Sequence, residues 1–309
     1  MNISIIGSGT MGIGIAHLTA QKNYKIILYD YSAKALKRGK NNLLDLLEKL
    51  VKKGKYTKKE SNKIINNIIF TENLNKVKKS NLVIEAIIED LKMKQEVFSK
   101  IEELVTPDCI LASNTSSLSI SSIASACKIS SRVIGMHFFN PANLMPLVEI
   151  IPSVQTSKDT IEKTKKILLG MDKTIVLAKD TPGFIVNRVA RPFYGESLRI
   201  YEEGIANFET IDWALKEIGG FKMGPFELMD YIGNDINYTV TQTVFKEFYY
   251  DPRYKPSFTQ KRLMEAGYLG RKSGRGYYDY TNEISKEINQ NRKLAKSIVL
   301  RVLSMLINE

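Results

Sequence analysis

The sequence predicts an α/β protein with an N-terminal, Rossmann-like, doubly wound and mostly parallel sheet that carries a helical-hairpin insertion, followed by an all-α C-terminal domain. Short β-branched runs alternate with helical segments up to about residue 178, and a glycine-rich loop joins the first run to the first helix. Beyond Asp180-Thr181-Pro182-Gly183 the pattern is helical or loop-like. We therefore expect two domains, residues 1–180 and residues 181–309.

The first thirty residues have the pattern of a βαβ unit. The β-branched run Ile3-Ser4-Ile5-Ile6 precedes the loop Gly7-Ser8-Gly9-Thr10-Met11-Gly12. A helical stretch to about Lys22 follows, and then a second strand that ends at Asp30.

This order predicts a dinucleotide site. Gly7 allows a tight turn, Gly9 lets a pyrophosphate approach the backbone, and Gly12 lets the helix pack on the strand. Asp30 lies eighteen residues beyond Gly12, close to the spacing of about 20 expected for a carboxylate on the adenosine ribose. Because an acid there repels a 2′-phosphate, NAD is favoured over NADP. The cofactor residues expected from this unit are Gly7, Gly9, Thr10, Met11, Gly12 and Asp30.

Two helical segments between Ser32 and about Ile69, broken near residues 54–57, predict the helical hairpin. Its second half is rich in lysine and contains the single acid Glu60. One interpretation is a solvated helix face. The other is an electrostatic landing surface for an anionic substrate tail, to which we assign Lys52, Lys55 and Lys59.

The rest of the first domain continues the alternation of strands and helices. Polar side chains gather where strands end, as in Ser113-Asn114-Thr115-Ser116-Ser117, and ligands collect at the carboxyl ends of parallel strands. Thr181 as N-cap and Pro182 in the first helical position predict a helix that runs to about Glu203. We expect strands at 81–86, 109–112, 132–139, 147–151 and 174–178, and helices at 91–104, 119–126 and 157–169.

The chain has two histidines, and their settings differ. His17 lies inside the first helix, where a structural histidine is expected. His137 ends a strand and precedes the turn-rich segment 140–143, after which Glu149 follows in a second strand among apolar neighbours. A carboxylate in such a run needs a partner. If the two strands fold back on each other, Glu149 lies beside His137, the arrangement of a general base and its orienting group.

From residue 1 to about 281 the chain resembles the NAD-dependent 3-hydroxyacyl-CoA dehydrogenases, and especially the short bacterial 3-hydroxybutyryl-CoA dehydrogenases. The resemblance rests on motifs that occur in order along the chain: Gly7 to Gly12, Val83-Ile84-Glu85-Ala86, Ser113-Asn114-Thr115-Ser116-Ser117-Leu118, His137-Phe138-Phe139-Asn140-Pro141, Pro182-Gly183-Phe184-Ile185-Val186-Asn187-Arg188, Gly224-Pro225-Phe226-Glu227-Leu228 and Gly270 to Tyr278.

The resemblance implies an activity and a set of roles. His137 would be the general base toward the substrate 3-hydroxyl, with Glu149 as its orienting partner. Ser116 would hydrogen-bond the substrate oxygen, and Asn187 would hold the thioester carbonyl, so that both domains contribute to the site. The residues implied near the nicotinamide half of NAD are Glu89, Lys94 and Asn114.

The expected reaction is NAD-dependent oxidation of a short-chain (S)-3-hydroxyacyl-CoA to the 3-ketoacyl-CoA, and its reverse, in fatty acid or butyrate metabolism. Two alternatives stay open. One keeps the fold and the base but acts on 3-hydroxyadipyl-CoA or a free 3-hydroxy acid. The other is a catalytically silent binding or structural protein of the same fold, as in lens crystallins related to the family. Acyl chain length and physiological direction are not determined by these residues.

Residues 282–309 extend beyond the resemblance. Shifted by 113 positions, Ile185, Val186, Arg188, Val189 and Glu196 recur as Ile298, Val299, Arg301, Val302 and Glu309. The tail is thus either the start of a truncated second helical repeat or an unrelated amphipathic helix. In both cases we expect it to pack on its own domain or on the partner of a homodimer built through the helical domain.

Composition excludes several classes of protein. With 43% hydrophobic and 25% charged residues the chain is an ordinary globular protein, and no apolar run is long enough to span a bilayer. Its net charge of +12 comes mainly from dispersed lysine, which favours anionic small molecules over nucleic acid. Cys109 and Cys127 form no CxxC motif or disulfide framework, and no targeting segment or metal motif is visible, so we expect a cytoplasmic protein without a metal.

Overall fold

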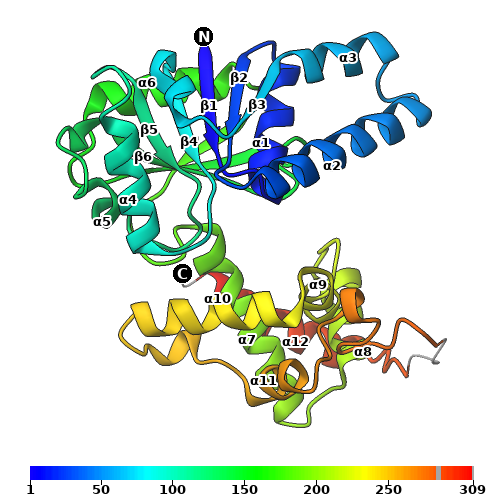
Figure 1. The fold of residues 1–309 in the computed structure, drawn as a ribbon. Coiled ribbons are helices and arrows are strands. Elements are labelled where there is room, and N and C mark those ends of the chain that lie inside the picture. Colours follow the sequence, from blue (N-terminus) through cyan, green and yellow to red (C-terminus); the bar gives the residue numbers. More distant parts are fainter. Residues whose placement is uncertain (283–286, 308–309) are drawn as a thin grey trace. The chain divides into compact units, whose positions relative to one another are not determined.

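A computed structural model describes residues 1–282 and 287–307. The chain divides into two compact units, with the division between Phe184 and Ile185. The first unit contains the sheet and the second is helical (Figure 1). Each is considered by itself.

The first unit is built on an eight-stranded sheet with the order β3-β2-β1-β4-β5-β6-β7-β8. Every neighbouring pair is parallel except β6 and β7, which run antiparallel, so the prediction of a mostly parallel doubly wound sheet is confirmed. The strands are β1 (Asn2–Ile6), β2 (Lys25–Tyr29), β3 (Ile68–Thr71), β4 (Leu82–Glu85), β5 (Ile110–Ser113), β6 (Val133–Phe138), β7 (Leu147–Pro152) and β8 (Thr174–Leu177).

Helices cover both faces of this sheet because its strands are apolar on both sides. On one face, Leu82 and Ile84 belong to the core that includes α1 (Thr10–Gln21) and α6 (Lys158–Leu169). On the other face, Val83 lies beside Phe98 and Ile101 of α4 (Leu91–Glu102). Helix α5 (Ile120–Ala124) contacts both α4 and β6.

The hairpin insertion consists of α2 (Ala33–Lys52) and α3 (Lys58–Asn66), and it extends away from the β3 side of the sheet (Figure 1). Ser32 caps α2, and Thr57 and Glu60 form a capping box on α3. The prediction that helix continues to about Ile69 was wrong, because Ile68–Thr71 forms β3. Its backbone pairs with β2, so tertiary pairing overrides the local pattern.

The antiparallel pair β6 and β7 is joined by a tight loop that contains a cis Asn140–Pro141 peptide bond. Lys173 stabilises this loop through two hydrogen bonds. Its buried ammonium donates to the carbonyls of Ala142 and Met145, both at 2.7 Å. Burial lowers the pKa of the Lys173 ammonium.

The expected helix from Thr181 begins later than predicted. Helix α7 spans Val186–Glu202, and Asn187 is its second residue. Gly183 and Phe184 have φ angles of +73° and +50°. A left-handed backbone cannot continue into a right-handed helix, so the N-cap signal at Thr181 starts only a turn.

The described part of the second unit contains six helices, four of which (α7, α8, α9 and α12) contribute buried side chains to an aromatic and aliphatic core that includes Phe226, Tyr277 and Leu215. Two buried aspartates, Asp212 and Asp230, organise its loops. The helices are α7, α8 (Phe208–Glu217), α9 (Pro225–Ile232), α10 (Asn234–Glu247), α11 (Phe258–Glu265) and α12 (Arg292–Ile307).

These aspartates explain the glycine-rich motifs of the second unit. Asp212 accepts the amides of Phe226 and Glu227, both at 2.9 Å, at the start of α9. Asp230 accepts the amides of Tyr277 and Tyr278, both at 3.0 Å. A Cβ on Gly224 would lie 2.3 Å from the Asp212 carboxyl, and one on Gly276 would lie 2.0 Å from that of Asp230. The motifs therefore brace the domain.

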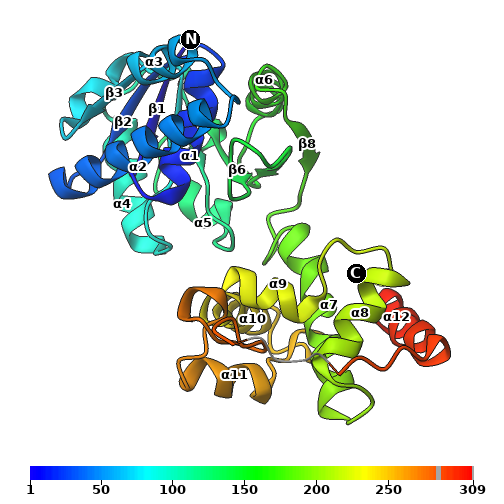
Figure 2. The same ribbon diagram turned by 90° about the vertical axis from the view of Figure 1, so that its right-hand side faces the viewer.

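Helix α12 packs on α7 and α8 of its own chain, the first of the two positions expected for the tail (Figure 2). Ala295, Ile298, Val299 and Val302 are buried there. Arg301 lies 2.6 Å from the buried Glu196 of α7 and also pairs with Glu203.

Asp212 gives the second unit a pH-dependent stability. Burial raises the pKa of its carboxyl from 3.8 to about 7, outweighing the hydrogen bonds that lower it. Between these values the folded protein retains a proton that the unfolded chain has released. The contribution of this group is therefore fully present below about pH 4 and is lost as the pH rises through 7.

Denaturant unfolding of the wild type and of Asp212→Asn between pH 4 and 8 measures this effect. The variant lacks the titrating carboxyl, so we expect it to be less stable at low pH but to lose less free energy of unfolding as the pH rises. Identical pH slopes for the two proteins would contradict the prediction.

Candidate active site

The loop between β1 and α1 has the geometry of a phosphate cradle. Gly7 has a φ angle of +104°, and a Cβ on Gly12 would lie 1.9 Å from the Gly7 carbonyl oxygen, so both positions require glycine. A Cβ on Gly9 would meet no atom of the protein within 4 Å. The space above Gly9, at a helix N-terminus with no side-chain cap, therefore fits an anionic group. Thr10 and Met11 are the first two residues of α1.

Asp30 follows the last residue of β2 and braces this loop. Its Oδ2 accepts the amide of Ser8 at 2.8 Å and the Ser8 hydroxyl at 2.7 Å, while Oδ1 accepts the amide of Ser32 at 3.0 Å. The carboxylate is thus held at the edge of the cradle, where it can accept from a ribose hydroxyl.

His137 and Glu149 occupy directly opposite positions of the antiparallel pair β6 and β7. Opposite residues project from the same face of a sheet, and Nδ1 of His137 lies 2.6 Å from Oε2 of Glu149. Both side chains are buried, and the His137 ring lies 4.5 Å from that of Phe139 between centroids.

This contact decides which ring nitrogen is available for chemistry. An ionised carboxylate can only accept, so Nδ1 of His137 donates to Glu149. In the neutral ring Nε2 then carries the lone pair and can accept a proton. Glu149 would stabilise the imidazolium that forms. The arrangement is that of a general base with its orienting acid.

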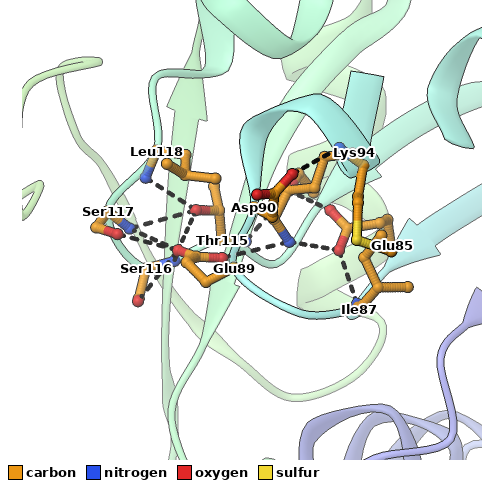
Figure 3. Close-up of polar contacts among 11 residues, drawn as sticks. Glu85, Ile87, Glu89, Asp90, Lys94, Thr115, Ser116, Ser117 and Leu118 are labelled. Carbon is orange, nitrogen blue, oxygen red and sulfur yellow. Dashed lines mark hydrogen bonds and ion pairs between the residues drawn. The ribbon is translucent and has the colours of Figure 1, made fainter. Parts of the chain in front are cut away.

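A second polar cluster lies at the ends of β4 and β5 (Figure 3). Lys94 of α4 is buried, and its Nζ lies 2.5 Å from Oε1 of Glu85 and 3.3 Å from Oε2 of Glu89. The other oxygen of Glu85 accepts from the Ser113 hydroxyl at 2.6 Å. The ammonium is thus paired with two carboxylates, which is the condition for keeping a lysine charged inside a protein.

Glu89 also contacts the loop that carries Ser116. Its Oε1 accepts from the amide of Ser116 at 3.0 Å and from the Thr115 hydroxyl at 2.5 Å. The Ser116 hydroxyl lies 3.4 Å from the same oxygen. Burial raises the pKa of Glu89, but the charge of Lys94 and, after it, these hydrogen bonds lower it overall.

The remaining expected site residues are spread over both units. Asn114 directly follows β5, and its Oδ1 accepts the amide of Phe138 at 2.9 Å, which ties β5 to the strand of His137. Asn187 lies in α7 of the second unit. Lys55 and Lys59 are exposed on the hairpin, and Lys52 pairs with Glu48 at 2.7 Å. His17 is buried, with Nε2 3.2 Å from the Tyr56 hydroxyl, and burial lowers the pKa of its ring to about 4.

Sequence reasoning gave no role to Glu85, Ser113 or Thr115. For Glu85 a signal existed, since it stands in the apolar run Leu82-Val83-Ile84 just as Glu149 stands among its apolar neighbours. The same argument that a buried carboxylate needs a partner applied to both. Ser113 and Thr115 carried no such signal because hydroxyl residues are common where strands end.

Neither a helix that could cross a membrane nor a group of metal-binding side chains occurs among the described residues. No helix among residues 1–282 and 287–307 is long and apolar enough to cross a membrane. In the same part of the chain, no three His, Cys, Asp or Glu side chains are grouped so that they could hold a metal ion.

Two family models match the chain. Residues 2–181 match the NAD-binding domain of 3-hydroxyacyl-CoA dehydrogenase, and residues 183–280 match the C-terminal domain of the same family. The cradle, the uncapped helix N-terminus and Asp30 fit NAD, so the expectation of this cofactor is confirmed.

Similar proteins carry related names. The chain is 42% identical to a 3-hydroxyadipyl-CoA dehydrogenase of Escherichia coli over 91% of its own length, and it spans 59% of that relative. It is 39% identical to a 3-hydroxybutyryl-CoA dehydrogenase of Clostridioides difficile, covering 91% of this chain and 99% of the other.

Solved structures agree with these relatives. The crystal structure of a 3-hydroxybutyryl-CoA dehydrogenase from Escherichia coli K12 matches with a TM-score of 0.91 and 41% identity, covering 94% of this chain and 62% of that one. The (S)-3-hydroxybutyryl-CoA dehydrogenase of Ralstonia eutropha matches with a TM-score of 0.86 and 36% identity, covering 91% and 99%.

Two glycine substitutions separate the roles of the loop. Gly9→Ala adds a methyl group where only a ligand would meet it, so we expect wild-type folding and a roughly tenfold weaker affinity for NADH. Gly12→Ala drives a methyl into the Gly7 carbonyl and should lower the melting temperature strongly. NADH fluorescence titration and thermal unfolding measure the two effects. Wild-type NADH affinity in Gly9→Ala would show that the open space is not the cofactor's.

Proposed function

Because the chain belongs to the 3-hydroxyacyl-CoA dehydrogenase family, we propose that it interconverts a short-chain (S)-3-hydroxyacyl-CoA and the 3-ketoacyl-CoA, with 3-hydroxybutyryl-CoA and acetoacetyl-CoA as the foremost pair. The observation that carries the proposal is the buried contact of 2.6 Å between Nδ1 of His137 and Oε2 of Glu149. It leaves Nε2 as a base next to the carboxyl edge of an NAD-binding sheet.

In the oxidative direction His137 accepts the proton of the 3-hydroxyl at Nε2, and Glu149 stabilises the resulting imidazolium. The C3–H bond breaks as the C3–O bond becomes a carbonyl, and NAD, when bound, supplies the acceptor for the hydride. In the reductive direction the imidazolium returns the proton to the carbonyl oxygen as general acid. Phe139 and Phe184 flank the ring and limit the access of water.

The other assigned residues position the two ligands. We assign the substrate oxygen to Ser116 and the thioester carbonyl to Asn187, and we place the nicotinamide half of NAD near Glu89, Lys94 and Asn114. Lys52, Lys55 and Lys59 are assigned to the phosphates of coenzyme A. Support for the lysine assignment is weakest at Lys52, since Glu48 already neutralises part of its charge.

The name of one relative supports a second candidate substrate. The relative that is 42% identical bears the name 3-hydroxyadipyl-CoA dehydrogenase, which makes a dicarboxylic acyl chain the alternative. Comparing the rates on acetoacetyl-CoA and 3-oxoadipyl-CoA decides between the two, because the second carries a terminal carboxylate that needs a cationic or hydrogen-bonding partner.

We further propose a cytoplasmic homodimer built through the second unit. Leu300 and Ile307 lie exposed on α12 and offer apolar contact area to a partner. Cys109 and Cys127 are free and buried, and burial raises the pKa of each thiol to about 12, which suits a reducing compartment. Sedimentation of the full chain tests the oligomeric state.

The general base is tested by His137→Ala. Loss of the proton acceptor should lower kcat for acetoacetyl-CoA reduction by about 10²–10⁴-fold, followed by NADH absorbance, while NADH affinity stays nearly unchanged. A near-normal rate would overturn the assignment. The kcat of Glu149→Gln should lie between those of the wild type and His137→Ala, because the imidazole ring remains but loses its orienting charge.

The hairpin lysines are tested by charge removal at two places. Lys55→Gln with Lys59→Gln should raise KM for acetoacetyl-CoA by roughly threefold at low salt, and the effect should shrink as salt screens the charges. Lys76→Gln with Lys78→Gln removes the same charge just before β4, at the amino edge of the sheet, and should leave KM unchanged. Equal KM values for both double variants would show that the hairpin lysines form only a solvated helix face and do not attract the substrate.

A further inference from the structure

We propose that Glu89 is a positioning residue for the substrate. Its carboxylate binds the backbone of residues 115–117, here called the Ser116 loop, and connects this loop to Lys94. The inference rests on the proposed function, because it takes Ser116 as the contact of the substrate oxygen. It goes further by giving Glu89 a task on the acyl-CoA side in addition to its placement near the cofactor.

The first observation is that one oxygen organises the whole loop (Figure 3). Oε1 of Glu89 accepts from the Thr115 hydroxyl at 2.5 Å, the Ser116 amide at 3.0 Å, and the Ser117 hydroxyl and amide at 3.1 and 3.2 Å. The Ser116 hydroxyl is the most distant donor, at 3.4 Å. Glu89 thus holds the Ser116 main chain closely and its hydroxyl only loosely.

This division suits a residue that must turn its hydroxyl toward a ligand. A hydroxyl at 3.4 Å contributes little to the loop, whereas the amide at 3.0 Å fixes where Cα and Cβ of Ser116 lie. The contact that Glu89 makes with the Ser116 main chain therefore does not depend on where the hydroxyl points. The negative charge matters because hydrogen bonds to an ionised acceptor are stronger than those to a neutral one.

The second observation is that the other oxygen of Glu89 faces Lys94. Oε2 lies 3.3 Å from the Lys94 ammonium, which lies 2.5 Å from Oε1 of Glu85. Only 1% of the Lys94 side chain is exposed, so its position is set by these two carboxylates rather than by water. Glu89 therefore contacts both the ammonium and the Ser116 loop.

The third observation is that Glu89 is itself held at both sides along the chain. The amide of Ile87 donates to Oε1 of Glu85 at 2.7 Å. Asp90 caps α4, accepting the amide of Met93 at 2.8 Å. The segment between β4 and α4 therefore fixes the position of Glu89 relative to the sheet, and Glu89 in turn fixes the position of the Ser116 loop. Such support from a rigid element is what precise positioning of a substrate contact needs.

Glu89→Gln tests the proposal. A glutamine cannot keep both contacts, because either its NH₂ faces the Lys94 ammonium or its oxygen leaves the loop donors. We expect the dissociation constant of acetoacetyl-CoA, measured without cofactor, to rise about tenfold and kcat/KM to fall by about 10–100-fold. NADH affinity should also fall, because Glu89 is placed near the nicotinamide, and for this reason acetoacetyl-CoA binding is measured without the cofactor. Glu96→Gln makes the same substitution on an exposed residue of α4 and should match the wild type.

A double-mutant cycle with Ser116→Ala separates positioning from simple loss of structure. If Glu89 acts through Ser116, adding Glu89→Gln to Ser116→Ala should lower kcat/KM by less than about threefold more. Thr115→Val, which removes one donor, should weaken acetoacetyl-CoA binding in the same direction, and Thr115→Ser should restore it. Melting temperatures confirm that each variant is folded.

Three outcomes bear on the two proposals. Effects of Glu89→Gln and Ser116→Ala that multiply would overturn the positioning role. Wild-type affinity for acetoacetyl-CoA in Glu89→Gln would do the same. A wild-type protein that neither binds nor reduces acetoacetyl-CoA would instead overturn the proposed function.

Discussion

The register of the sheet is the constraint on which the site depends. Parallel pairing places Glu85, Ser113 and Gly135 in one row across β4, β5 and β6, and the single antiparallel pair places Glu149 opposite His137 two residues further along β6. Because side chains alternate between the faces of a strand, these groups project from one face near the carboxyl edge. A shift of one residue in β7 would turn Glu149 away from His137.

Burial explains why the carboxylates of Glu85 and Glu149 each have a cationic or polar partner. Glu85 and Glu149 are both fully buried, so each has exchanged water for a cationic or polar neighbour. Glu85 meets the Lys94 ammonium and the Ser113 hydroxyl, whereas Glu149 meets the His137 ring. Two identical side chains thus serve different ends. Glu85 pairs with the buried Lys94 ammonium, and Glu149 orients the ring of His137.

Local patterns predicted those parts of the site that lie within one or two adjacent elements. The glycine loop, Asp30 and the pairing of His137 with Glu149 follow from spacing along the chain. The contacts of Glu89 with the Ser116 loop did not, since these partners lie 26 to 28 residues away on a neighbouring strand end and no periodicity marks them. Strand β3 was missed for the same reason, because it exists only through pairing with β2. The late start of α7 followed from left-handed residues that the capping signal does not reveal.

Helix α12 is weakly similar in sequence to the start of α7 and also packs against α7. The residues around Ile298 resemble those around Ile185 in sequence, and the helix they form packs on α7, the helix that it resembles. Arg301, the counterpart of Arg188, pairs with Glu196 of α7 and with Glu203, the residue after this helix. Since Glu196 is buried, Arg301 and Arg199 together compensate its charge. The counterpart of Asn187 is the exposed Leu300, so α12 covers α7 without repeating its polar group. The residues that the two helices share therefore include buried packing residues of α12, whereas the amide of Asn187 has no counterpart there.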